Sequence, residues 1–127
     1  MLTKKLTIRN ISGISKTDEA KIICFLQGAI YCWCKNRAEE WFAVRDLLGG
    51  ANFHWQGIPL IVLYEKHINK GKSNTRSIED AGKDAGWLLL KTIKSDIRLF
   101  DTKREALTRK YLWLPNNTTN SLAGKTA

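Results

Sequence analysis

The sequence predicts a mainly α-helical domain that ends in a small antiparallel β-hairpin. Apolar residues recur at helical spacing over 17–36, 38–48 and 59–69. Two β-prone runs, 98–100 and 110–113, flank a polar, charged loop. With 127 residues, 43% of them apolar, the chain has enough material for one core but hardly for two. We therefore expect a single domain.

The first elements follow from local signals. Residues 2–8 mix apolar and polar side chains, which fits either a short edge strand or an unstructured lead-in. Thr17, followed by two acidic residues that suit a helix N-terminus, begins a helix that extends to Asn36. Its wide apolar stripe makes it the expected spine of the domain. The stripe consists of Ile22, Ile23, Phe25, Leu26, Ala29, Ile30 and Trp33.

Two shorter helices are predicted next. The helix over 38–48 ends at a pair of glycines, which commonly close helices. Pro59 fits the first turn of another helix, because its missing amide would be unpaired there in any case. That helix extends to Asn69. A basic loop, 70–76, follows it.

The C-terminal half predicts two further short helices. Ser77 is a suitable N-cap for the first of them, since its hydroxyl can accept a hydrogen bond from an unpaired amide. Gly82 and Gly86 supply flexibility for a tight turn before the second helix, 87–95. On that helix Leu89 and Ile93 share one face, which we expect to point into the core.

This order of elements resembles a winged helix-turn-helix domain over residues 59–114. The matching positions are the small residues of the turn, the inward face of the second helix and the two wing strands: Ala81, Gly82, Ala85 and Gly86; Leu89 and Ile93; Arg98 to Phe100 and Lys110 to Trp113. The resemblance implies a winged-helix-like C-terminal half within a domain at 17–114, with an N-terminal helical extension. Residues 1–16 are then a lead-in or short strand, and the polar segment 115–127 a flexible tail.

The charge of the chain agrees with a nucleic-acid partner. The net charge is +9, and residues 66–110 alone hold 12 basic and 6 acidic side chains, a net of +6. Such a field attracts phosphate backbones. Together with the resemblance, it predicts a protein that binds double-stranded DNA, as a transcriptional regulator or an accessory factor in a DNA transaction. The alternative is a protein-interaction or assembly module that binds no nucleic acid.

The candidate DNA contacts fall in three groups: the basic loop, the outer face of helix 87–95, and the wing. They are Lys72, Ser73, Thr75 and Arg76; Trp87, Lys91, Lys94 and Ser95; and Lys103, Arg104, Arg109 and Lys110. Lysines on the helix would meet phosphate or guanine edges in the major groove, as the resemblance implies. Arg104 is the strongest wing candidate, because a guanidinium holds phosphate with two hydrogen bonds.

Three alternatives stay open at this point. Trp87 fits a groove contact less well than its neighbours, because a large aromatic residue is as readily buried under another helix. Residues 59–69 are a second candidate for the recognition helix, although their outward side chains suit DNA less well. The basic loop is also equally compatible with a solvated connector.

Catalytic and cofactor motifs are not recognisable. His54 and His67 lack a neighbouring nucleophile motif. The triplet 71–73 reads Gly-Lys-Ser, but a phosphate loop needs a glycine five residues earlier, where Lys66 stands. An acid-x-Lys spacing at 101–103 falls in a predicted turn, outside the strand context that a nuclease needs. We expect no enzyme activity, no cofactor, no metal and no small-molecule ligand.

The cysteines and the longest apolar run bear on location. Cys24, Cys32 and Cys34 form an odd set within an apolar stretch, which is typical of buried, reduced thiols. The apolar run 22–34 has 13 residues, short of the roughly 20 that a membrane span needs. These observations predict a cytoplasmic protein without a membrane partner. The five tryptophans and the apolar spine leave room for a homodimer contact.

Overall fold

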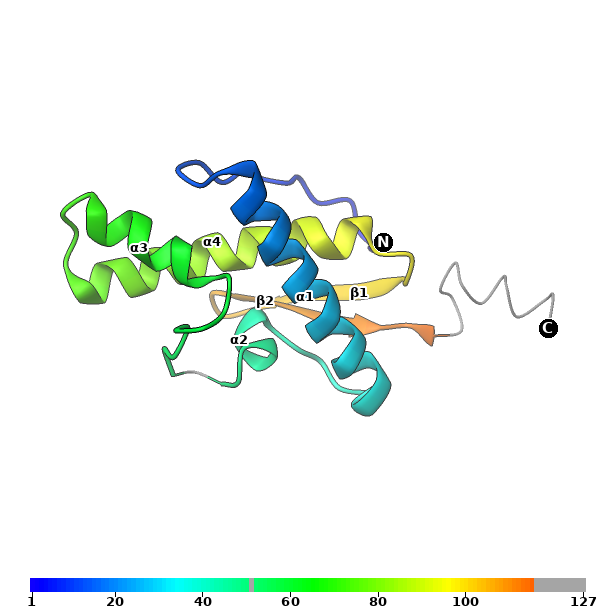
Figure 1. Ribbon diagram of the computed structural model, residues 1–127. Coiled ribbons are helices and arrows are strands. Elements are labelled where there is room, and N and C mark those ends of the chain that lie inside the picture. The colour runs from blue at the N-terminus through cyan, green and yellow to red at the C-terminus, as the bar shows by residue number, and fades with distance from the viewer. Residues whose placement is uncertain (51, 116–127) are drawn as a thin grey trace.

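The computed structural model describes residues 1–50 and 52–115, and within them helices pack with a two-stranded sheet (Figure 1). The elements are α1 (Lys16–Asn36), α2 (Val44–Leu47), α3 (Ile61–Asn69), α4 (Asn74–Ser95), β1 (Phe100–Glu105) and β2 (Thr108–Trp113). The helix α1 crosses the hairpin, whereas β1 runs back beside the C-terminal half of α4 (Figure 1). The mainly helical class with an antiparallel hairpin is therefore confirmed.

The long helix α1 confirms the predicted spine. Ser15 caps it, because its Oγ accepts a hydrogen bond from the Asp18 amide at 3.0 Å. The buried positions recur every four residues, so a single stripe faces the core. They are Ile22, Leu26, Ile30 and Cys34. Cys24 and Cys32 lie on the exposed side, so the expectation of three buried thiols is right for Cys34 alone.

The predicted helix over 38–48 is much shorter in the structure. Only Val44–Leu47 is helical, and Phe42 instead forms an antiparallel bridge with Tyr111. The two residues exchange backbone hydrogen bonds of 2.9 and 2.8 Å. The extended backbone places the Phe42 side chain in the core, where it is fully buried against aromatic neighbours. Tertiary packing has overridden the helical pattern here.

The predicted turn at Gly82 and Gly86 is wrong, because both glycines lie inside the continuous helix α4. The helix begins after Ser73, whose Oγ accepts the Arg76 amide at 3.1 Å, and not at Ser77. Small residues on its inner face allow α3 to pack closely against it. Ser77, Ala81 and Ala85 are each fully buried on α4. The two helices of this region are thus α3 and α4, joined by the turn at 70–73.

The hairpin and the N-terminal segment form the remaining framework. The register of the hairpin pairs Phe100 with Trp113 at one end and Glu105 with Thr108 at the other. This leaves a two-residue turn at 106–107. The predicted strands, 98–100 and 110–113, were separated by a loop at 101–109. In the structure β1 and β2 include most of that loop. Leu2 forms an isolated parallel bridge with Phe100, and residues 3–15 contain no strand.

The core joins α1 and α4 to the sheet. Leu89 is 1% exposed and Ile93 is completely buried, so the predicted inward face is confirmed. Trp87 is partly buried and packs against the same core. Among the described residues, no helix is both long and apolar enough to cross a membrane. The tail predicted at 115–127 lies outside the described residues from position 116 onward.

Candidate nucleic-acid interface

The end of the hairpin brings four basic residues together in two directly opposed pairs. Lys103 faces Lys110 across the strands, and Arg104 faces Arg109. Like charges in directly opposite positions destabilise a hairpin. Glu105 is the one carboxylate within 103–110, so this stretch carries a net charge of +3. We call residues 103–110 the hairpin end.

The two lysines of the hairpin end are partly compensated. Lys103 Nζ and Lys110 Nζ lie 3.3 and 3.0 Å from the carboxylate of Glu105. These contacts lower the pKa of Glu105, the hydrogen bond from Lys110 being the largest cause. Lys103 Nζ also lies 4.3 Å from the ring centroid of Trp41, in a cation–π contact. These contacts hold both lysines in place, and the single carboxylate of Glu105 partly neutralises the two positive charges.

The two arginines differ from the lysines because no carboxylate among the described residues pairs with them. Arg104 is exposed, and no ion pair or hydrogen bond of its side chain is found among the described residues. Arg109 donates from Nη1 to Thr102 Oγ1 at 3.3 Å, a neutral partner. Thr102 is itself buried and donates to the carbonyl of Lys110 at 3.0 Å. Within the described part of the chain, the hairpin end thus holds two guanidinium groups that no acid neutralises.

The start of α4 gathers a second basic group around one acid. Lys72 Nζ and Arg76 Nε lie 2.8 and 3.2 Å from Oδ2 of Asp80. Lys83 reaches the other oxygen at 4.0 Å. Ser73 is committed to capping the helix, and Thr75 is exposed on the first turn. The Arg76 side chain remains 62% exposed, so its guanidinium stays accessible to a phosphate.

The pKa of Asp80 falls to about 2, and the hydrogen bond from Lys72 is the main cause. A carboxylate with a depressed pKa stabilises the fold above its ordinary value near 3.8, and this contribution is lost as pH falls toward 2. We therefore expect Asp80→Asn to lower the melting temperature at pH 5 to 7. The difference from wild type should shrink between about pH 4 and 2. A difference that is constant down to pH 2 would exclude this role for the carboxylate.

The polar side chains predicted to contact DNA from the second half of α4 instead bind partners within the protein. Lys91 Nζ pairs with Glu19 of α1 at 3.0 Å, and Lys94 Nζ donates to the Leu6 carbonyl at 2.6 Å. The Ser95 hydroxyl donates to the carbonyl of Lys91. The N-terminal segment and α1 therefore occupy the face that the sequence assigned to a DNA groove. The twelve predicted residues do not form one continuous cluster of contacts.

A polar network between α3 and α4 was not foreseen from the sequence. His67 Nε2 lies 2.8 Å from Oδ2 of Asp84, and its Nδ1 lies 2.8 Å from Lys72 Nζ. Lys66 contacts the same carboxylate oxygen at 2.8 Å and donates to the Ser12 carbonyl. These side chains are largely buried, so the network ties the helical hairpin and the N-terminal segment together. Asp80 and Asp84, which lie four positions apart and so share one face of α4, were the feature of the sequence that could have indicated this network.

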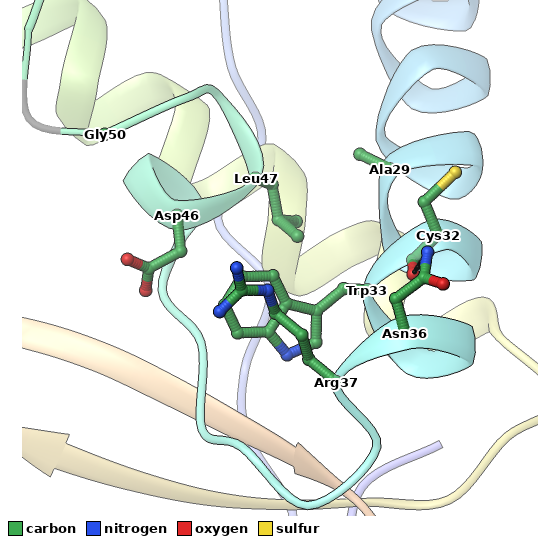
Figure 2. A pocket seen from close by; sticks show the side chains of 8 residues that line it. All are labelled: Ala29, Cys32, Trp33, Asn36, Arg37, Asp46, Leu47 and Gly50. Atoms are coloured by element: carbon green, nitrogen blue, oxygen red, sulfur yellow. Dashed lines mark hydrogen bonds between the residues drawn. The ribbon is translucent and has the colours of Figure 1, made fainter.

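An open cavity of about 470 Å³ lies between α1 and α2 (Figure 2). Arg37 lies over the ring of Trp33, 5.2 Å from its centroid, and pairs with Glu40 at 3.1 Å. Asp46 accepts the amide of Ala43 and so belongs to the turn into α2. The polar groups of the cavity thus serve local structure. The lining residues are Ala29, Cys32, Trp33, Asn36, Arg37, Asp46, Leu47 and Gly50.

Comparisons with protein-family models, with curated proteins and with solved structures give no match for this chain. Within residues 1–50 and 52–115, no group of three or more His, Cys, Asp or Glu side chains is arranged to hold a metal ion.

Proposed function

We propose that this protein binds double-stranded DNA through the hairpin end, as a regulator or accessory factor in a DNA transaction. The observation that carries the proposal is the pair of cross-strand arginines, Arg104 and Arg109, which no acid in residues 1–50 and 52–115 neutralises. Opposed like charges are unfavourable for the fold itself. A polyanion bound along the hairpin would relieve that repulsion. Guanidinium groups suit phosphate because they donate two parallel hydrogen bonds.

The order of the elements supports a winged-helix arrangement for this function. The helices α3 and α4 are joined by a short turn and followed by the hairpin, and this is the order of helix, turn, helix and wing in such a domain. The bridge from Phe42 to Tyr111 adds a third chain segment beside β2. The hairpin turn and the start of α4 face the same end of the molecule (Figure 1). The start of α4 extends beyond the hairpin turn at that end (Figure 1).

The contacts on α4 favour its first half over its second as the part that meets DNA. Arg76 and Lys83 are 62% and 71% exposed, whereas Lys91 and Lys94 are bound to α1 and to the N-terminal segment. Thr75 is exposed beside Arg76 and can donate to a phosphate. We therefore assign Lys72, Arg76 and Lys83 to backbone contacts that position the protein. Such contacts carry no sequence information of their own.

The experiment is a fluorescence anisotropy titration of a labelled generic duplex with the full chain at several salt concentrations. Each neutralised phosphate contributes about 0.9 to the slope of log affinity against log salt. Four contacts from the hairpin end would then reduce affinity about a hundredfold between 50 and 200 mM salt. Absence of binding at 50 mM would refute the proposal. Self-association that is insensitive to salt, with no duplex binding, would favour the interaction module instead.

A further inference from the structure

The turn of the hairpin presents a single large apolar side chain to solvent. Leu107 is 89% exposed, well above Ile97 at 53% and Tyr31 at 49%. It lies between Arg104 and Arg109 along the chain, within the net +3 of the hairpin end. Leucine at such a position buries little area in the fold, so packing does not account for it.

The backbone of the same turn also departs from the usual pattern. Ala106 has φ of 55°, and it is the only residue other than glycine with a positive φ among the described residues. Two-residue hairpin turns normally place Asn, Asp or Gly in this conformation. The turn therefore combines an unfavourable backbone residue with an unfavourable surface residue. Local rules are broken in this way chiefly at functional sites.

We propose that Leu107 is a wedge that enters the minor groove and inserts between two stacked base pairs. The inference rests on the proposed function, because it requires that the hairpin end meets a duplex. Apolar wedges flanked by basic side chains unstack base steps in this way and bend the duplex. Arg104 and Arg109 would hold the phosphates on either side while the side chain enters. The small Ala106 beside it leaves room for the groove walls.

Charge and size favour a duplex over a lipid surface as the occupant. A lipid-bound element needs a broad apolar face, whereas this turn offers one leucine. The opposed guanidinium pair suits phosphates on two strands, and arginine is favoured in a narrow minor groove. The wedge should therefore prefer steps that unstack easily. Pyrimidine–purine steps such as TA, and mismatched pairs, are the expected sites.

The experiment uses a short duplex with 2-aminopurine beside a central TA step, because this base brightens when it unstacks. Wild-type protein should raise its fluorescence, and Leu107→Ala should abolish the rise. We expect Leu107→Ala to weaken affinity for this duplex about threefold to tenfold. Its salt slope should stay unchanged, since no cation is lost. Leu107→Phe should restore the fluorescence rise, and Ile97→Ala serves as the matched control for an exposed apolar residue.

The outcomes separate the wedge from DNA binding itself. Duplex binding by Leu107→Ala with wild-type affinity and wild-type fluorescence would overturn the wedge and leave the proposed function standing. Absence of duplex binding by the wild-type chain would overturn both. Sedimentation with vesicles of phosphatidylserine and phosphatidylcholine is the second arm. Vesicle binding that depends on Leu107, without any fluorescence change on duplex, would assign the turn to lipid and overturn the proposal.

Discussion

Replacement of Phe42 by alanine is expected to destabilise the fold by about 3 to 5 kcal/mol, the cost of truncating a fully buried phenylalanine. Its ring is completely buried and lies 5.6 to 6.1 Å from those of Trp33, Phe100 and Tyr111. These neighbours come from α1, β1 and β2, so one side chain joins the spine to both strands of the hairpin. Chemical denaturation of the purified variant measures the effect.

The matched control for Phe42→Ala is Leu107→Ala, which removes an apolar side chain from solvent. Because Leu107 is 89% exposed, its loss should change the free energy of unfolding by less than about 0.5 kcal/mol. A loss below about 1 kcal/mol for Phe42→Ala would contradict the packing described for this ring. It would also remove the physical reason for the extended backbone at that position.

The sequence predicted those elements whose local and tertiary signals agree. The helix α1 has an N-terminal acidic pair and an unbroken apolar stripe, and the stripe is the face that the core buries. The hairpin followed from two β-prone runs, and its inner residues Phe100 and Tyr111 are buried as alternation requires. Leu89 and Ile93 were also placed correctly, since their spacing on one face holds whether the helix is short or long.

The errors arose where long-range contacts decide the backbone. Helical spacing at 38–48 could not reveal that Phe42 pairs with Tyr111, a residue 69 positions later. Gly82 and Gly86 were interpreted as a turn, yet a glycine inside a helix costs only about 1 kcal/mol relative to alanine. The close packing of α3 against the small residues of α4 offsets that cost. Neither the pairing of Phe42 with Tyr111 nor the packing of α3 on α4 can be inferred from a short stretch of neighbouring residues.

The candidate site was predicted in part for the same reason. The basic residues of the hairpin end were identified from composition, but their opposition across the strands depends on a register that the sequence did not specify. The internal partners of Lys91 and Lys94 depend on where α1 and the N-terminal segment lie. Leu107 was missed because the usual turn signal is absent: Ala106 occupies the position where Asn or Gly would mark a hairpin.

Reversal of the two uncompensated charges, Arg104→Glu with Arg109→Glu, is expected to reduce affinity for duplex DNA by at least about a hundredfold at 50 mM salt. Two phosphate contacts are lost, and carboxylates placed against phosphates repel them. The fold should tolerate the change, because one like-charged cross-strand pair replaces another. The melting temperature of the variant, measured in parallel, checks this point.

The most direct test of DNA binding through the hairpin end compares this variant with Lys16→Glu combined with Lys21→Glu. Both lysines are exposed on α1, so the control alters the net charge by the same amount at a different place. The measurement is the anisotropy of a generic labelled duplex at 50 mM salt. We predict near-wild-type affinity for the α1 control and at least about a hundredfold loss for the hairpin variant. Equal losses for both variants, or full binding by a folded hairpin variant, would contradict the assignment of DNA binding to the hairpin end.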